Sequence, residues 1–492
     1  MKSLLQLFPT PGRQFAAIAA ALTALRIVAL IFGHPNLGPD EGQYWFWSKA
    51  PDFGYFSKPP LIAWSILATT SIFGDAEWAV RASAPLYQLG AAIFLFFLTR
   101  RIAGPREALV AGLTWLTLPG VFLSASLATT DAPLVFFWSA ALYFYFVLTD
   151  ARETSGKART AALLGAAIGL GFLSKYAMAY FALGAALSLS VSPSRRRAAG
   201  AANLAIAALV ALAAFAPNIW WNAQNDFETL AHTAANANWS RNFGHPDQLF
   251  KFLGEQFGIA GPVLLVVMLL AATFGRRAAT GEKRDAMSAL LAFSIPAIAI
   301  IAVQSFISRA HGNWAAVAYP SAVVMAAIYS FGEKRALIAL KASLMLHAAV
   351  GLGFLAAFVS SAFADGIGAS AAFKRLRGWE EQGKAIAEIS ANYDAIMVDD
   401  REIAGELVYY AREGKPIVAW NSNVRIDSHF EAYFPFEPAR DRRVLYVTAR
   451  SDALYIQYGF KTIIPLSALS ARIGDGRVRT LYLFEVSDFA AP

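Results

Sequence analysis

The 492-residue sequence contains no cysteine. That absence excludes disulfides, thiolate nucleophiles and cysteine-built metal sites, although it does not identify the compartment. Charged residues are also scarce: they make up 15% of the chain, against about a quarter in soluble domains. Hydrophobic residues make up 57%. The composition therefore predicts an integral membrane protein.

The sequence contains many long apolar runs. Runs of about 17–25 apolar residues predict eleven membrane-spanning helices. They lie approximately at residues 15–33, 80–99, 107–126, 132–149, 160–174, 176–192, 201–217, 258–274, 286–306, 313–331 and 336–360. Residues 1–13 lack a signal-peptide cleavage pattern, so the first span is expected to stay uncleaved.

The formal net charge of +8 does not indicate a nucleic-acid partner, because the basic residues gather in short loops between spans. With eleven spans and a cytoplasmic N-terminus, every basic cluster falls on the cytoplasmic side. Merging the fifth and sixth spans would place later clusters outside. The clusters are Arg100/Arg101/Arg106, Arg152/Lys157/Arg159, Arg195-Arg196-Arg197, Arg276/Arg277/Lys283/Arg284 and Lys334/Arg335/Lys341.

Two predicted outer loops are long, residues 34–79 and 218–257. The first is rich in aromatic residues that suit the membrane–water boundary, so we expect short interfacial helices there. Residues 1–360 are predicted to form the transmembrane domain, and 361–492, where charge rises, a soluble extracytoplasmic α/β domain. The predicted strands are 395–398, 416–420, 443–448, 461–465 and 478–486, and the predicted helices are 371–390 and 402–413.

Polar residues that could bind or act on a substrate gather on the predicted outer face. Adjacent carboxylates, Asp40 and Glu41, directly follow the first apolar span, where they need water, a cation or a substrate. Asp131 opens the fourth span, Lys175 lies between the fifth and sixth, and His311-Gly312-Asn313 precedes the tenth. This sidedness predicts a polar site on the outer face.

These motifs resemble the GT-C glycosyltransferases. They are Asp40-Glu41-x-x-Tyr44, then Tyr55-Phe56-x-Lys58-Pro59-Pro60-Leu61 followed by Trp64, and Asp131 at the start of a span. The chain is most similar to the aminoarabinose transferases of lipid A and the protein O-mannosyltransferases, that is, glycosyltransferase family 39 and its neighbours. The resemblance covers residues 15–220 well and is weaker beyond.

The resemblance implies a GT-C fold and an enzyme that transfers a hexosyl or pentosyl group. The donor would be a sugar linked to polyprenyl phosphate, and the acceptor lipid A or another lipopolysaccharide component, a polysaccharide or a protein. The reaction would take place at the periplasmic face of a bacterial inner membrane. The β-trefoil modules of eukaryotic protein mannosyltransferases have no counterpart in the sequence, which favours a bacterial envelope enzyme.

Three acids are candidates for catalysis. An acceptor hydroxyl that attacks an anomeric carbon must lose its proton, and Asp40 is the candidate base. A helix cap or a structural ion pair is the alternative for Asp40. Asp131 is expected to orient the acceptor or the catalytic loop, or else to act as an N-cap. Glu41 is a weaker candidate, because adjacent side chains rarely serve one centre.

Lys58 is the candidate contact for the donor phosphate, whose charge grows as the glycosidic bond breaks. The alternative is a lysine that snorkels to the interface. Further candidates for substrate binding are Tyr44, Tyr55, Lys175, Arg241, His311 and Asn313. Interface anchoring, snorkelling and structural hydrogen bonding are their alternatives.

One departure from the family concerns Ser57, since the aminoarabinose transferases have an acid there. The departure weakens the inference that an amino sugar is transferred. No cofactor is expected: a divalent metal is conceivable beside Asp40 or Asp131, but the sequence has no dedicated ligand cluster. Two other functions remain open, a lipid or glycolipid transporter and an O-antigen ligase or polymerase. The one-sided polar set argues against the first, and the C-terminal soluble domain against the second.

Overall fold

The computed structural model describes residues 9–239, 244–421 and 425–490. The chain forms two compact units. The first comprises Met1–Val28, Lys58–Ile62 and Arg81–Leu355, and the second comprises Ala29–Ser57, Ala63–Val80 and Ala356–Pro492. The units therefore do not follow chain order, because most of the first predicted outer loop folds with the C-terminal residues. The division into domains at residue 360 stays a prediction.

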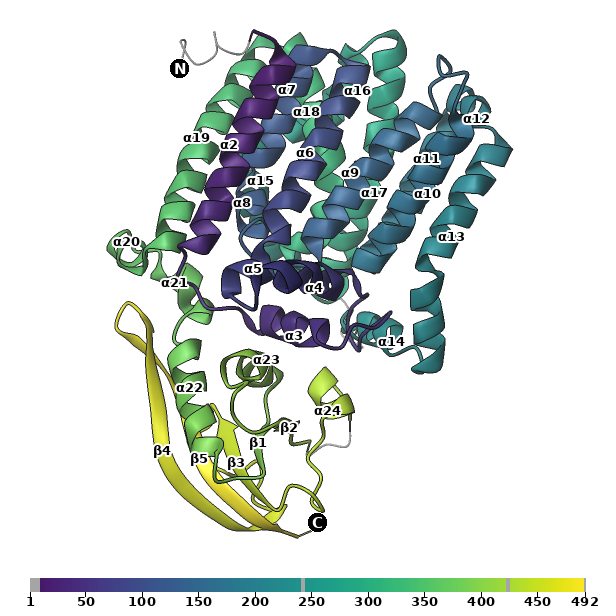
Figure 1. Cartoon of the computed structure of the whole chain (residues 1–492). Helices are drawn as coiled ribbons and strands as arrows, with labels where there is room; N and C mark the ends of the chain where they lie inside the picture. The colour runs from purple at the N-terminus through teal and green to yellow at the C-terminus, as the bar shows by residue number, and fades with distance from the viewer. Residues whose placement is uncertain (1–8, 240–243, 422–424, 491–492) are drawn as a thin grey trace. The chain divides into compact units, whose positions relative to one another are not determined.

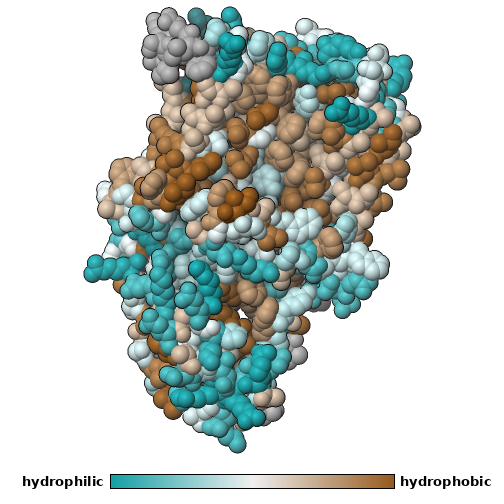
Figure 2. All heavy atoms as spheres, in the orientation of Figure 1, coloured by the Kyte–Doolittle hydropathy of each residue, from teal (hydrophilic) through white to brown (hydrophobic). Residues whose placement is uncertain are grey.

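The first unit is a bundle of helices (Figure 1). Its elements are α2 (Pro11–Ile31), α6 (Ser83–Ile102), α7 (Pro105–Thr117), α8 (Pro119–Ser124), α9 (Asp131–Leu148), α10 (Lys157–Ser174), η1 (Tyr176–Met178), α11 (Ala179–Val191), α12 (Pro193–Ala199), α13 (Ala201–Gln224), α14 (Glu228–Ala235), α15 (Pro246–Ala260), α16 (Pro262–Ala278), α17 (Gly281–Ile307), η2 (Gly312–Ala318), α18 (Tyr319–Gly332) and α19 (Lys334–Val359). In Figure 2 the visible face of this bundle is largely hydrophobic, as expected of a surface that lipid covers.

Within the described ranges, seven helices are long and apolar enough to cross a membrane, or nine if each of two bent pairs counts as one span. The bent pairs are Tyr176–Val191 with Pro193–Ala199, and Pro246–Ala260 with Pro262–Ala278. The multi-pass architecture is thus confirmed. The number eleven stays a prediction, because α7 has only 13 residues and α10 carries two basic residues in its first turn.

Close helix packing explains part of this bundle. A Cβ atom on Gly165 would lie 2.3 Å from the carbonyl oxygen of Ala207, and one on Gly169 would lie 2.5 Å from Ala214 Cβ. These glycines are four residues apart on one face of α10, so α13 can approach its backbone directly. Only residues without a side chain fit at this helix crossing.

The loop predicted at residues 218–257 is more helical than expected. Helix α13 continues to Gln224 although Pro217 lies inside it, and α15 already begins at Pro246. A proline removes one helical hydrogen bond, but transmembrane helices tolerate this loss where neighbouring groups satisfy the freed carbonyl. Helix α13 therefore extends seven residues beyond the predicted span 201–217.

The second unit combines short helices with a five-stranded sheet. The predicted interfacial helices are present as α3 (Pro39–Ser48), α4 (Leu61–Phe73, of which residues 63–73 belong to this unit) and α5 (Glu77–Arg81). The sheet has the order β2-β1-β3-β5-β4, with β1 parallel to β2 and β3, and β5 antiparallel to β3 and β4. The remaining elements are α20 (Ser361–Gly366), α21 (Ser370–Phe373), η3 (Lys374–Leu376), α22 (Trp379–Ser390), β1 (Ala395–Val398), α23 (Arg401–Tyr410), β2 (Ile417–Ala419), α24 (His429–Tyr433), β3 (Arg443–Thr448), β4 (Phe460–Gly474) and β5 (Arg477–Phe489).

Helix α3 packs against α23 at two glycines. A Cβ atom on Gly42 would lie 2.0 Å from the carbonyl oxygen of Gly405, and one on Gly405 would lie 2.4 Å from that of Pro39. The hydroxyl of Tyr410 also accepts a hydrogen bond from the Leu37 backbone N–H at 2.6 Å. Helix α3, with its candidate site residues, is therefore fixed to the C-terminal part of its own unit.

Candidate functional site

The start of α3 separates the two adjacent acids. Glu41 is buried, and its Oε2 accepts a hydrogen bond from the Gly38 backbone N–H at 2.8 Å, which caps the helix. Asp40 points outward: its side chain is 58% exposed and its Oδ1 lies 3.1 Å from Arg401 Nη2. Arg401 is itself 45% exposed, so this ion pair is open to solvent. Of the two acids, Asp40 is the one available to a ligand.

Tyr44 within α3 and Tyr55 after it are held in an aromatic cluster. Tyr55 stacks on Trp47 with ring centroids 4.6 Å apart, and Tyr44 lies 5.4 Å from the same ring. The Tyr55 hydroxyl accepts a hydrogen bond from Asp52 N–H and donates one to the Trp47 carbonyl, both at 3.1 Å. Burial raises the pKa of Tyr55 to about 12, so its hydroxyl stays neutral. Tyr55 thus ties the loop after α3 to the end of that helix.

A second set of candidates meets in the first unit. Asp131 Oδ1 accepts a hydrogen bond from Lys175 Nζ at 2.8 Å, and Asp131 Oδ2 accepts one from Asn313 Nδ2 at 2.7 Å. The Lys175 and Asp131 side chains are 23% and 13% exposed. Asp131 begins α9, Lys175 follows α10 in an extended conformation, and Asn313 belongs to η2. The structure thus joins three predicted residues from three segments.

The alternative interpretation of Asp131 as an N-cap does not hold. Thr130 occupies that position and makes no side-chain cap, while both Asp131 oxygens bond to side chains of other segments. Because two donors fix the carboxylate, Asp131 is suited to holding Lys175 and η2 in place.

Helix α15 and the end of α13 support this cluster. Glu255 Oε2 accepts a hydrogen bond from the Gly312 backbone N–H at 2.6 Å, and a Cβ atom on Gly312 would lie 2.9 Å from Glu255 Cβ. Directly after Lys175, the Tyr176 hydroxyl donates to Asn218 Oδ1 at 2.9 Å. The segments that carry Asn313 and Lys175 are therefore each fixed by a buried or half-buried polar contact.

The remaining predicted residues are placed as follows. Lys58 is half-buried, lies directly before the Pro59-Pro60 pair and belongs to the first unit. His311 is exposed, and its ring lies 5.6 Å from that of Trp314. Arg241 lies outside the described residues. Among the described residues there is no group of three or more His, Asp or Glu side chains that could hold a metal ion.

Sequence reasoning missed two partners in these arrangements. Arg401 lies 361 residues after Asp40, and Glu255 lies 57 residues before Gly312. No local pattern marks either residue, because each contact depends on how distant segments pack. A search for single charges beside glycines or helix starts would have found both, together with many unrelated residues.

Comparisons with known proteins agree with this fold. Residues 57–221 match the family profile described as dolichyl-phosphate-mannose-protein mannosyltransferase. The chain is 33% identical over 437 residues to the lipid A galacturonosyltransferase RgtD of Rhizobium johnstonii, covering 88% of this chain and 90% of that protein. It is 32% identical over 169 residues to the undecaprenyl phosphate-alpha-4-amino-4-deoxy-L-arabinose arabinosyl transferase of Edwardsiella ictaluri, covering 32% of this chain and 31% of that one.

Solved structures show the same architecture. ArnT from Cupriavidus metallidurans in the apo state has a TM-score of 0.68 at 16% identity, with 96% of this chain and 97% of that chain covered. The same protein bound to undecaprenyl phosphate has a TM-score of 0.67 at 17% identity, covering 97% and 98%. Together with the 33% identity over most of its length to a glycosyltransferase, this places the chain in the GT-C superfamily, among the relatives of family 39 and of the aminoarabinose transferases, as an integral-membrane glycosyltransferase.

Proposed function

We propose that this enzyme transfers a galacturonosyl residue from a polyprenyl-phosphate-linked donor to lipid A. The observation that carries the proposal is the 33% identity to a lipid A galacturonosyltransferase over 88% of this chain and 90% of that protein. The aminoarabinose transferase of Edwardsiella ictaluri matches only 32% of the chain at similar identity. A relationship that extends over both units favours the same sugar and the same acceptor.

The proposed reaction is a single displacement. An acceptor hydroxyl oxygen forms a bond to the anomeric carbon, the bond from that carbon to the phosphate oxygen breaks, and polyprenyl phosphate leaves. Asp40 takes the proton from the hydroxyl, for which its exposed carboxylate is suited. The proposal gives Lys58 and Lys175 the task of stabilising charge on the leaving phosphate.

The charge of the residues also favours a uronic acid over an amino sugar. A galacturonosyl group carries a carboxylate, whereas an aminoarabinosyl group carries an ammonium that an acidic neighbour would bind. Ser57 stands where the aminoarabinose transferases have such an acid. His311 and Arg241 are candidate partners for a sugar carboxylate.

We further propose a location in the bacterial inner membrane with the N-terminus cytoplasmic. The argument is the sidedness of the basic clusters between predicted spans. On this topology residues 361–492 are periplasmic, and so is the catalytic face, where lipid A is accessible before export.

The test uses purified enzyme in lipid nanodiscs with a lipid A acceptor. Polyprenyl-phosphate-linked galacturonate and polyprenyl-phosphate-linked aminoarabinose are supplied separately, and the lipid product is identified by mass spectrometry. We expect a product only with the galacturonate donor. A product only with aminoarabinose would overturn the sugar assignment, and no product with either donor, in a preparation that binds polyprenyl phosphate, would overturn the acceptor. Lipid A from a deletion strain supplies the same comparison in cells.

A further inference from the structure

A cavity of about 430 Å³ lies in the first unit among α11, α12, α16 and α17. It is at the opposite end of the bundle from the Asp131 cluster. Asp131 begins α9, whereas Thr149, which directly follows α9, contacts the cavity residue Arg195. An 18-residue helix is about 27 Å long, so the two places are a bundle length apart.

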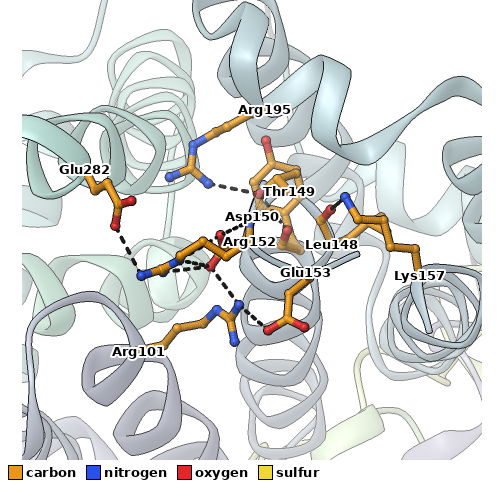
Figure 3. Close-up of polar contacts among 10 residues, drawn as sticks. Arg101, Leu148, Thr149, Asp150, Arg152, Glu153, Lys157, Arg195 and Glu282 are labelled. Atoms are coloured by element: carbon orange, nitrogen blue, oxygen red, sulfur yellow. Dashed lines mark hydrogen bonds and ion pairs between the residues drawn. The ribbon is translucent and has the colours of Figure 1, made fainter. Parts of the chain in front are cut away.

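Arg195 is the buried cation of this cavity, with a residue exposure of 8%. Its Nε lies 2.6 Å from Asp285 Oδ2, its Nη1 donates to Thr149 Oγ1 at 2.9 Å, and its guanidinium stacks over the Phe146 ring. Figure 3 shows Arg195 with its bond to Thr149. Among the described residues its Nη2 has no hydrogen bond, so the two N–H groups of that nitrogen stay available.

The cavity carries an excess of positive charge. Arg195, Arg276 and Arg284 line it with a single carboxylate, Asp285. Within the described ranges neither Arg276 nor Arg284 forms an ion pair; Arg284 Nε donates only to the Ala279 carbonyl. Three serine hydroxyls line the same space, at positions 188, 192 and 288.

A neighbouring network of ion pairs differs from the cavity, because each of its arginines is paired with acids. Arg101 pairs with Asp150 at 2.7 Å and with Glu153 at 2.6 Å, and Arg152 pairs with Asp150 at 2.7 Å and Glu282 at 3.3 Å (Figure 3). Two arginines there meet three acids. Strong pairing by Arg152 and Arg101 lowers the pKa of Asp150, which is fully ionised. Both arginines of this network thus have acidic partners, whereas two of the three cavity arginines form no ion pair within the described ranges.

Apolar side chains lead from the cavity along α11. Leu183, Leu187 and Val191 are exposed and spaced by four residues, so they form one stripe on the helix, and Val191 also lines the cavity. A ligand with an anionic head and an apolar tail would place its head among the arginines and its tail on this stripe. A free phosphate would use only the head site.

We propose that this cavity binds the phosphate of an anionic phospholipid. Arginines bind phosphate oxygens in a bidentate manner, and basic pockets between membrane helices at the cytoplasmic side are suited to such headgroups. The positive-inside rule assigns this end of the bundle to the cytoplasmic leaflet. The proposed lipid is therefore distinct from the donor and the acceptor, which the proposed function places on the other face.

The test measures lipid retention by the full-length protein in neutral detergent, with native mass spectrometry as readout. The probes are phosphatidylglycerol, phosphatidylcholine and inorganic phosphate. The double variant Arg276→Gln/Arg284→Gln removes two cavity cations. The matched control Arg277→Gln/Lys283→Gln removes two exposed cations from α16 and α17 that do not line the cavity.

We expect wild type to prefer phosphatidylglycerol to phosphatidylcholine, and the cavity variant to bind phosphatidylglycerol about 10–25-fold more weakly, at roughly fivefold for each cation. The control should change less than about threefold. Equal losses in both double variants would overturn the proposal, as would wild-type binding without headgroup preference. Competition by inorganic phosphate at the same concentration as the lipid would reassign the site to a free anion. The measurement does not depend on transferase activity, so its failure leaves the proposed function untouched.

Discussion

Lys175 Nζ lies 2.8 Å from Asp131 Oδ1, although 44 residues separate the two in the chain. The pair is mostly buried at the ends of two neighbouring helices, and the second carboxylate oxygen is bound by Asn313. A mostly buried lysine that lost its carboxylate partner would keep an uncompensated charge, which destabilises the folded protein. Substitutions can therefore measure what this ion pair contributes to the stability of the protein.

Asp131→Asn should destabilise the protein by about 1–3 kcal/mol, because Lys175 then keeps its charge without a carboxylate. The double variant Asp131→Asn/Lys175→Gln should be less destabilised than the sum of the single variants. Thermal unfolding in detergent measures all three. Additive effects would show that the ion pair does not contribute to folding.

Asp40→Asn should lower the rate of transfer by about 10²–10⁴ while donor binding is retained, because the amide cannot accept the acceptor's proton. Single-turnover assays with the galacturonate donor measure the rate. Arg401→Gln is the matched control: it removes the exposed ion pair but not the base, so it should change the rate far less. If Arg401→Gln and Asp40→Asn reduced transfer equally, the ion pair rather than the base would explain the loss.

Lys58→Ala should weaken polyprenyl phosphate binding and also slow the chemical step, because charge on the phosphate increases as the bond breaks. Lys58→Arg should rescue only in part, since a planar guanidinium replaces a compact ammonium. Full rescue by arginine would instead indicate snorkelling to the interface. Carrier-lipid affinity and single-turnover rate are measured for both variants.

Reporter fusions at residues 198 and 370 should give opposite signals. The arginine cluster of α12 is expected in the cytoplasm, and residues after 361 in the periplasm. Equal signals would contradict both the eleven-span topology and a catalytic site on the outer face.

Stability should fall as the pH is lowered from about 7 to 4, because of His429. Burial lowers the pKa of His429 to about 4, and its ring packs against Trp47 and Tyr433. Between that value and the ordinary pKa of 6.5 the unfolded chain binds a proton that the folded chain does not, so stability decreases with falling pH, by about 3 kcal/mol at most. His429→Phe keeps an aromatic ring without titration and should flatten the profile. An unchanged profile in this variant would assign the pH dependence to other groups.

The sequence predicted what depends on local pattern. Strands β1 and β3 were predicted to the residue because buried β-branched and apolar residues with polar ends define them. Strand β4 runs from Phe460 to Gly474 and is therefore longer than the predicted 461–465, continuing past Pro465. As an edge strand, β4 accommodates this proline beside a bulge between Pro465 and Ala468.

For the candidate site too, some features could be predicted from local sequence pattern and others depend on how distant segments pack. The Asp131, Lys175 and Asn313 segments could be predicted to share one face, because hydropathy and basic clusters fix sidedness. Their hydrogen bonds could not, since these depend on which helices are neighbours. Glu41 illustrates a third case: its sequence position beside Asp40 suggested chemistry, whereas its side chain completes the helix start.

The contact between Gly42 and Gly405 has a consequence for how such enzymes are recombined. Because backbone meets backbone there, residues 29–57 and 63–80 form one compact unit with residues 356–492. A chimera that exchanges only residues 361–492 with those of a relative would bring a mismatched surface against α3, although the Asp40-Glu41 motif itself would be unchanged. A chimera that exchanges all three segments together keeps the contact between Gly42 and Gly405 within one parent sequence. Recombination libraries should therefore place their crossovers at the boundaries of these segments.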